Sequence, residues 1–133
     1  MRKKILLVDV QPDLGRLIQR VLHDCEVRQA FSAGTALALA YAWTPQLFVV
    51  DLRLPDIHGA ELVRIIQRDR FLASTPIIIV SALVDIPQYS EGPISLYGCP
   101  AFPKPFKIEA LRKEVESRCL AHVPVLNPVS RKN

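Results

Sequence analysis

Apolar residues along the chain follow two alternating patterns, short continuous runs and spacings of three or four positions. The runs Lys4–Val8, Leu47–Asp51 and Ile77–Val80 are typical of strands buried on both faces of a parallel sheet. Two weaker segments are predicted to be shorter strands, Cys25–Ala30 at the periphery of the sheet and Pro100–Pro103 near the end of the chain. The pattern therefore predicts five strands.

Segments with helical spacing lie between these strands and after the last one. Pro12 suits the first position of a helix, Ser32 is a suitable N-cap, and Thr44-Pro45 ends a helix. The four helices are predicted to span Pro12 to about His23, Ala33–Trp43, roughly Ala60–Phe71, and Ile108 to about Ala121. The residues of the third helix expected to face the sheet are Leu62, Val63, Ile65 and Ile66. This alternation predicts a parallel α/β sheet with helices on both faces and right-handed crossovers.

Two segments lack a regular pattern. Between Leu83 and Cys99, the residues Pro87 and Gly92-Pro93 leave room for at most two short helical turns. The end of the chain, from Val123, contains two prolines and no periodicity, which is typical of a linker or an extended arm. We therefore expect one domain over residues 1–122 and a linker or tail over residues 123–133.

Composition excludes several classes of protein. The chain has 133 residues, half of them apolar, but no apolar run approaches the roughly 18 residues that a membrane span needs. The three cysteines are odd in number and lack metal-ligand spacing, which indicates reduced thiols in a cytosolic protein. The net charge of +4 comes from scattered Lys and Arg, without a basic helix or an aromatic stripe. We therefore expect neither a membrane nor a nucleic acid as a direct partner.

Four polar side chains follow the predicted strands, at the edge of the sheet where ligands bind in open α/β folds. They are Asp9, Asp51, Ser81 and Lys104. Carboxylates ligate Mg²⁺ through oxygen, and an ammonium and a hydroxyl group can hold phosphoryl oxygens. A carboxylate can also be the nucleophile that forms an aspartyl phosphate. A nucleotide site is not favoured, because the first strand is followed by V-Q-P-D-L-G and not by a glycine-rich loop.

These strand ends carry the motifs of a known family. The motifs are I-L-L-V-D at the first strand, P-Q-L-F-V-V-D-L-R-L-P-D-I-H-G at the third, P-I-I-I-V-S-A at the fourth and K-P-F at the fifth. In this register the sequence resembles the receiver domain of two-component response regulators, from residue 4 to about residue 121. The resemblance implies a flavodoxin-like fold, a five-stranded parallel sheet in the order 2-1-3-4-5.

The resemblance also implies a role for each polar residue. Asp51 would accept a phosphoryl group from a sensor histidine kinase or a phosphotransfer protein. Mg²⁺ would be ligated by Asp9, Asp51 and the backbone carbonyl of Arg53. Ser81 and Lys104 would bind phosphoryl oxygens, and Lys104-Pro105 would be a cis peptide. The chain would not be an enzyme beyond catalysing its own phosphoryl transfer and dephosphorylation.

The sequence departs from the family pattern at three places. Receivers usually have a second acid directly after the first, a direct metal ligand, but this position is Val10, followed by Gln11. Since Asp13 is expected to face away from the pocket, Mg²⁺ binding is predicted to be weak. The family's fourth helix is expected to be short or irregular here. The usual switch aromatic is replaced by Ala101, and Phe102 is expected to face the core.

Three functions therefore stay open. The first is a cytoplasmic phosphoacceptor in a two-component phosphorelay, which the surviving polar residues favour. The second is a degenerate receiver, a protein-interaction module that works without phosphorylation, which Val10 and the broken fourth helix favour. The third is a nucleotide- or flavin-binding enzyme of the same fold. Homodimer formation, the kinase partner and the output are left open.

Overall fold

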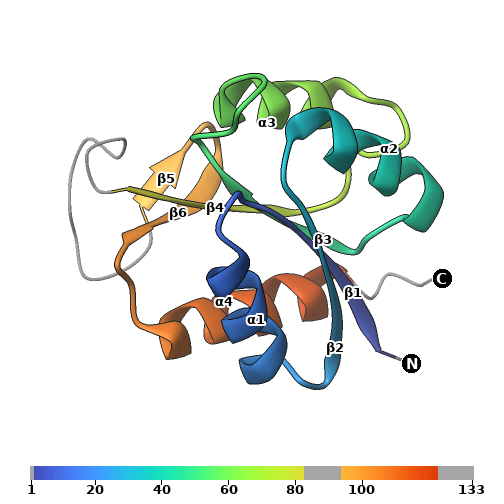
Figure 1. Cartoon of the computed structure of the whole chain (residues 1–133). Helices are drawn as coiled ribbons and strands as arrows, with labels where there is room; N and C mark the ends of the chain where they lie inside the picture. Colours follow the sequence, from blue (N-terminus) through green and yellow to red (C-terminus); the bar gives the residue numbers. More distant parts are fainter. Residues whose placement is uncertain (1, 83–93, 123–133) are drawn as a thin grey trace, which may run out of the picture.

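The computed structural model describes residues 2–82 and 94–122, with side chains described as far as residue 119. A single sheet lies between two layers of helices (Figure 1). The sheet contains β1 (Lys3–Val8), β2 (Cys25–Ala30), β3 (Leu47–Asp51), β4 (Ile77–Ala82), β5 (Ile94–Leu96) and β6 (Cys99–Lys104). The helices are α1 (Pro12–Val21), α2 (Ala33–Trp43), α3 (Gly59–Arg68) and α4 (Ile108–His122). The predicted alternation of strands and helices is confirmed.

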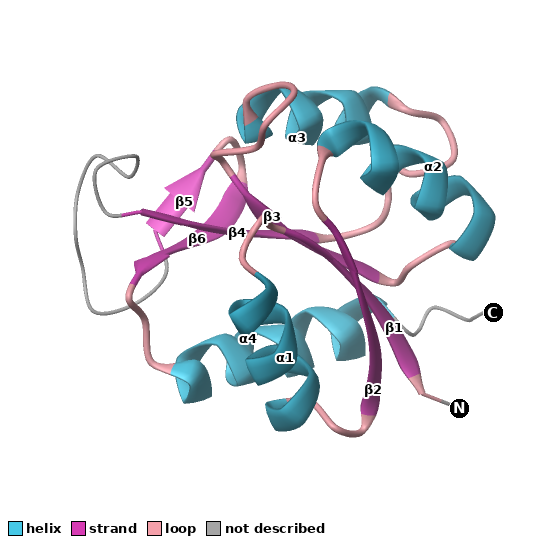
Figure 2. Cartoon of the chain, viewed as in Figure 1, coloured by secondary structure: helices cyan, strands magenta, loops and turns pink. Residues whose placement is uncertain are grey.

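The strand order is β2-β1-β3-β4-β6-β5. The first five of these strands are parallel and reproduce the predicted order 2-1-3-4-5, with β2 at the edge as expected. The prediction of only five strands is wrong, because β5 pairs antiparallel with β6 and extends the sheet (Figure 2). This hairpin turns at Tyr97 and Gly98, both with positive φ. The remainder of the segment expected to be a short or irregular helix, residues 83–93, lies outside the described residues.

Each face of the sheet is covered by one pair of helices (Figure 2). The alternating side chains of β1 divide between the faces, with Leu6 in the cluster beneath α2 and α3, and Leu7 in the cluster beneath α1 and α4. The neighbours Ala101 and Phe102 of β6 divide in the same way. Phe102 is buried and meets Phe106 edge to face, which confirms the expectation that Phe102 faces the core. Core side chains therefore pack against both faces of the central strands.

The third helix is shorter than its apolar pattern suggests. It ends at Arg68 and not near Phe71, because Asp69 is extended and its carboxylate accepts hydrogen bonds from the backbone N–H groups of Phe71 and Leu72. Ile65 was expected to face the sheet, but it is 38% exposed, since a ten-residue helix presents only one stripe to the core. Side-chain capping thus overrides apolar periodicity at this end.

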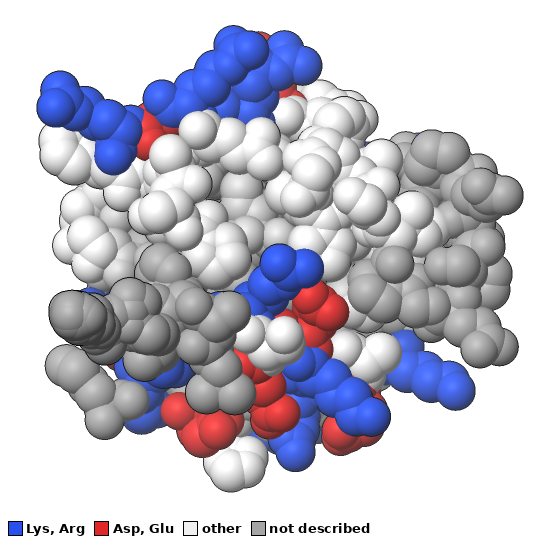
Figure 3. All heavy atoms as spheres, turned by 180° about the vertical axis from the view of Figure 1, so that it is seen from behind, with Lys and Arg blue, Asp and Glu red and all other residues white. Residues whose placement is uncertain are grey.

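Charged side chains are arranged unevenly on the surface. On the face seen in Figure 3, a basic group lies at the top, an uncharged zone lies below it, and acidic and basic side chains mix at the bottom. Helix α4 contributes ion pairs from Arg112 to Glu109 and Glu116, and from Arg118 to Glu114. Such partly exposed pairs add little stability.

Candidate functional site

The carboxyl ends of the parallel strands place the two key carboxylates side by side. Asp9 directly follows β1, and Asp51 is the last residue of the neighbouring strand β3. Both are buried: Asp9 is completely inaccessible to solvent, and Asp51 is 6% exposed. Burial of two unpaired carboxylates would be strongly unfavourable, so their partners decide what the site can do.

Two groups bind Oδ1 of Asp51. The Ser81 hydroxyl of β4 donates a hydrogen bond to it over 2.8 Å. The backbone N–H of Arg53 donates to the same oxygen over 3.0 Å and so fixes the start of the loop after β3. The strand register explains the approach of the hydroxyl, because Asp51 is paired with Val80, the residue before Ser81.

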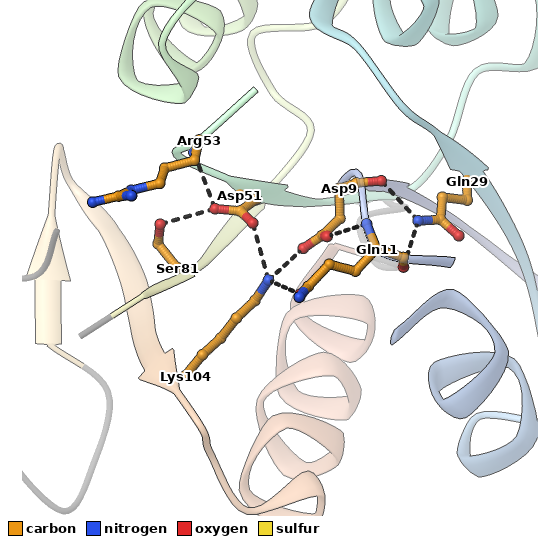
Figure 4. A network of polar contacts seen from close by, with 7 residues as sticks. All are labelled: Asp9, Gln11, Gln29, Asp51, Arg53, Ser81 and Lys104. Atoms are coloured by element: carbon orange, nitrogen blue, oxygen red, sulfur yellow. Dashed lines mark hydrogen bonds and ion pairs between the residues drawn. The ribbon is translucent and has the colours of Figure 1, made fainter. Parts of the chain in front are cut away.

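The ammonium group of Lys104 connects the two carboxylates. Its Nζ lies 2.8 Å from Oδ2 of Asp9 and 2.9 Å from Oδ2 of Asp51 (Figure 4). The same nitrogen donates to Oε1 of Gln11 over 2.8 Å. Since Lys104 ends β6 and is paired with Ala82 of β4, its side chain reaches across β4 and β3 toward β1. The four residues predicted from the strand ends therefore form one cluster.

The charges of this cluster perturb one another. Two carboxylates and one ammonium give a formal charge of −1. Burial raises the pKa of the Asp9 carboxyl, although hydrogen bonds from Lys104 and from the Gln11 N–H act in the opposite direction. Burial alone would lower the pKa of Lys104, but its contacts with Asp9 and Asp51 outweigh this effect, so that pKa lies above its ordinary value. Lys104 is therefore positively charged at neutral pH.

The loop after β3 is fixed by two close contacts. A Cβ atom on Gly59 would lie 2.3 Å from the carbonyl oxygen of Asp51, so only glycine lets α3 begin this close to the strand end. Asp56 accepts hydrogen bonds from the backbone N–H groups of Ala33 and Gly34 at the start of α2. These bonds lower the pKa of Asp56 and join the loop to a second helix.

The peptide between Lys104 and Pro105 is cis, as predicted.

Sequence reasoning missed two residues of the cluster, Gln11 and Gln29. Gln11 accepts from Lys104, and Nε2 of Gln29 donates to the backbone carbonyl oxygens of Asp9 and Gln11. The amide side chains of Gln11 and Gln29 carry no charge, and neither residue lies in the family motifs quoted above. The available signal was the position of Gln29 near the end of β2, in register with Leu7 of the strand that leads to Asp9.

The position at which the family usually has a second acid holds an exposed apolar residue in this chain. Val10 is 43% exposed. The nearby Asp13 forms an ion pair with Arg16 and has a side chain that is 92% exposed, so it faces away from the pocket as predicted. The fully buried carboxylate of this segment is thus Asp9 alone.

The donor chemistry of the pocket fits Mg²⁺ in part. Asp9 and Asp51 supply the carboxylate oxygens that this ion prefers. However, within residues 2–82 and 94–119 no three His, Cys, Asp or Glu side chains are grouped so that they could hold a metal ion. Lys104 also contacts one oxygen of each carboxylate, where a cation would compete with it.

Known proteins resemble this chain in sequence and in structure. Residues 5–116 match the family model of the response regulator receiver domain. The chain is 32% identical over 117 residues to the response regulator ArlR of Staphylococcus saprophyticus, an alignment that covers 86% of this chain and 51% of ArlR. It is 27% identical over 117 residues to the chemotaxis protein CheY of Pseudomonas aeruginosa, covering 85% and 93%. The chain thus spans about half the length of ArlR and nearly all of CheY.

The fold comparison agrees with this match. The receiver domain of the Francisella response regulator 1452 superposes with a TM-score of 0.76 and 25% identity, covering 90% of this chain and 98% of that one. The chain therefore belongs to the response regulator receiver domain family, and its fold is the flavodoxin-like receiver fold. Proteins of this family act in two-component signalling and are not enzymes in the usual sense. In the described part of the chain, no helix is long and apolar enough to cross a membrane.

Proposed function

We propose that this chain is a cytoplasmic receiver that accepts a phosphoryl group on Asp51 from a sensor histidine kinase or a histidine phosphotransfer protein. One observation carries the proposal. The two carboxylate oxygens of Asp51 are bound by different groups, Oδ1 by the Ser81 hydroxyl and Oδ2 by the Lys104 ammonium. After phosphorylation, these two donors are within reach of the new phosphoryl oxygens.

The chemistry is a single displacement at phosphorus. An oxygen of the Asp51 carboxylate attacks the phosphorus of a phosphohistidine, and the P–N bond breaks as the new O–P bond forms. The imidazole nitrogen leaves with the electron pair and takes up a proton from water. Lys104 offsets the negative charge that collects on the phosphoryl oxygens, and Ser81 donates a hydrogen bond to one of them.

Mg²⁺ is part of this proposal as a weakly bound ion. Asp9, Asp51 and the backbone carbonyl of Arg53 would hold it, because these groups supply oxygen ligands at the carboxyl end of the sheet. When bound, the ion would neutralise charge on the phosphoryl group during transfer. Weak binding is supported by the small formal charge of the pocket, −1, and by the valine at position 10.

Incubation with a small phosphodonor and Mg²⁺, followed by intact-mass measurement, tests the proposal. The parent protein should gain the mass of one phosphoryl group. The Asp51→Asn variant removes the nucleophile but keeps the shape of the side chain, so it should gain nothing under the same conditions. The Asp13→Asn variant is a matched control, because Asp13 faces away from the pocket. This variant should gain one phosphoryl group, as the parent does. An adduct that persists in Asp51→Asn would place the site elsewhere.

A second function, a protein-interaction module that works without phosphorylation, is favoured by a separate observation. Each oxygen of the Asp9 and Asp51 carboxylates already accepts at least one hydrogen bond from a protein donor. A pocket satisfied in this way can persist as a purely structural element. Absence of any adduct on the parent, with a small phosphodonor and with a phosphorylated histidine phosphotransfer protein as donors, would favour this second function.

A further inference from the structure

Gln11 meets the acidic pocket through three of its atoms. Its backbone N–H donates to Oδ1 of Asp9 over 2.9 Å, and its side-chain Oε1 accepts from Lys104 over 2.8 Å. Its backbone carbonyl oxygen accepts from Nε2 of Gln29 over 3.0 Å. Gln11 therefore contacts a buried acid, the ammonium group and a neighbouring strand at once, although it lies on an exposed loop (Figure 4).

Gln29 holds this loop in place from β2. Its Nε2 donates two hydrogen bonds, over 2.7 Å to the carbonyl oxygen of Asp9 and over 3.0 Å to that of Gln11. These two bonds lie on either side of position 10 in the sequence. Space for the Gln29 side chain comes from Gly15 in α1, where a Cβ atom would lie 1.9 Å from Oε1 of Gln29. The loop after β1 is thus held by Gln29 of β2, whose side chain packs against Gly15 of α1.

The acceptors around Lys104 match its donors. An ammonium group has three N–H bonds and no acceptor. Lys104 has three oxygen partners, one each from Asp9, Asp51 and Gln11, at 2.8–2.9 Å. A cation that enters between the carboxylates must therefore separate an ammonium group from partners that satisfy all of its donors.

We propose that Gln11, held by Gln29, is a positioning residue that fixes Lys104 as the resident counter-ion of the pocket and so opposes the binding of divalent cations. The inference rests on the proposed function only in treating Asp9 and Asp51 as the carboxylates that such a cation contacts. On this proposal, the Mg²⁺ affinity of the receiver depends on the neutral amide of Gln11 as well as on the absence of an acid at position 10.

The test compares Mg²⁺ affinity in Gln11→Met and in the parent, without phosphodonor. Methionine keeps the length of the side chain but cannot accept the hydrogen bond from Lys104 with comparable strength. Because this contact is partly exposed to solvent, its loss should tighten Mg²⁺ binding by about three- to tenfold. Binding is followed through the backbone amide shifts around Asp51. Gln19→Met is the matched control, because Gln19 donates to the carbonyl oxygen of Val27 and should leave the affinity unchanged.

A second readout follows Lys104 directly. Its ammonium protons should exchange slowly with water in the parent and give an NMR signal, and the exchange should accelerate in Gln11→Met. Equal Mg²⁺ affinities of the two proteins, including absence of binding to both, would overturn the proposal, as would unchanged ammonium exchange. Both measurements are independent of phosphoryl transfer, so failure of Asp51 to accept a phosphoryl group would leave their outcome unaffected.

Discussion

Replacement of Val10 by aspartate should raise the Mg²⁺ affinity of the pocket. The pocket contains two carboxylates and one ammonium group, so the substitution changes its formal charge from −1 to −2. At an effective dielectric constant of about 20, one unit charge about 4 Å from a divalent ion contributes roughly 8 kcal/mol before desolvation. Position 10 is 43% exposed, so solvent screening and desolvation remove most of this energy. We expect a net gain of about 1–3 kcal/mol, or roughly 5- to 150-fold in Mg²⁺ affinity.

The assay is a Mg²⁺ titration of the parent, Val10→Asp and Val10→Asn, followed through amide shifts around Asp51. Val10→Asn offers an oxygen ligand without the charge, so it should gain much less than Val10→Asp. Phosphorylation of Asp51 by a small phosphodonor should become faster in Val10→Asp. Without divalent cations the added repulsion should lower the free energy of unfolding by about 1 kcal/mol. Equal affinities of parent and Val10→Asp would mean that position 10 does not face the pocket, and the reasoning would be refuted.

Three further predictions concern the supports of the site. In Gly15→Ala the new methyl group should displace Gln29, so a Mg²⁺ titration should show tighter binding than in the parent. The free energy of unfolding in urea should change little, because the better helix propensity of alanine, worth roughly 1 kcal/mol, offsets the lost hydrogen bonds of Gln29. Gly59→Ala should lower the free energy of unfolding by about 3 kcal/mol or more, because the methyl group meets the Asp51 backbone, and a loss below about 1 kcal/mol would contradict this. Asp56→Ala should be less stable than the parent at pH 7, since hydrogen bonds lower the pKa of Asp56 in the folded state. This difference should disappear as the pH falls below the unfolded value of about 3.9 and through the folded pKa.

The strands and the polar residues at their ends could be predicted because each depends on local signals. The runs that form β1, β3 and β4 are apolar on both faces, and this pattern fits few structures other than a central parallel strand. Once the strands are parallel, their carboxyl ends meet at one edge, so Asp9, Asp51 and Ser81 must lie near one another. The cluster follows from topology, which a sequence pattern can indicate.

The missed features depend on contacts between distant residues. Strand β5 has only three residues and is defined by its pairing with β6 across a turn with positive φ, which no periodicity reveals. Gln29 reaches the loop of Gln11 because Gly15, 14 positions earlier in the chain, leaves space for its side chain. Such relations are set by packing in three dimensions, and neutral amides give no charge signal that would point to them.

Chemical mapping of the acyl phosphate tests the central claim most directly. After incubation with a small phosphodonor and Mg²⁺, reduction with borohydride converts a phosphorylated aspartate to homoserine, which peptide mass spectrometry then locates. Phosphoryl acceptance on Asp51 predicts homoserine at position 51 and at no other position, in proportion to the adduct seen in the intact protein. Homoserine at Asp9 or Asp56, or no homoserine despite a full adduct, would contradict the claim that Asp51 is the phosphoacceptor.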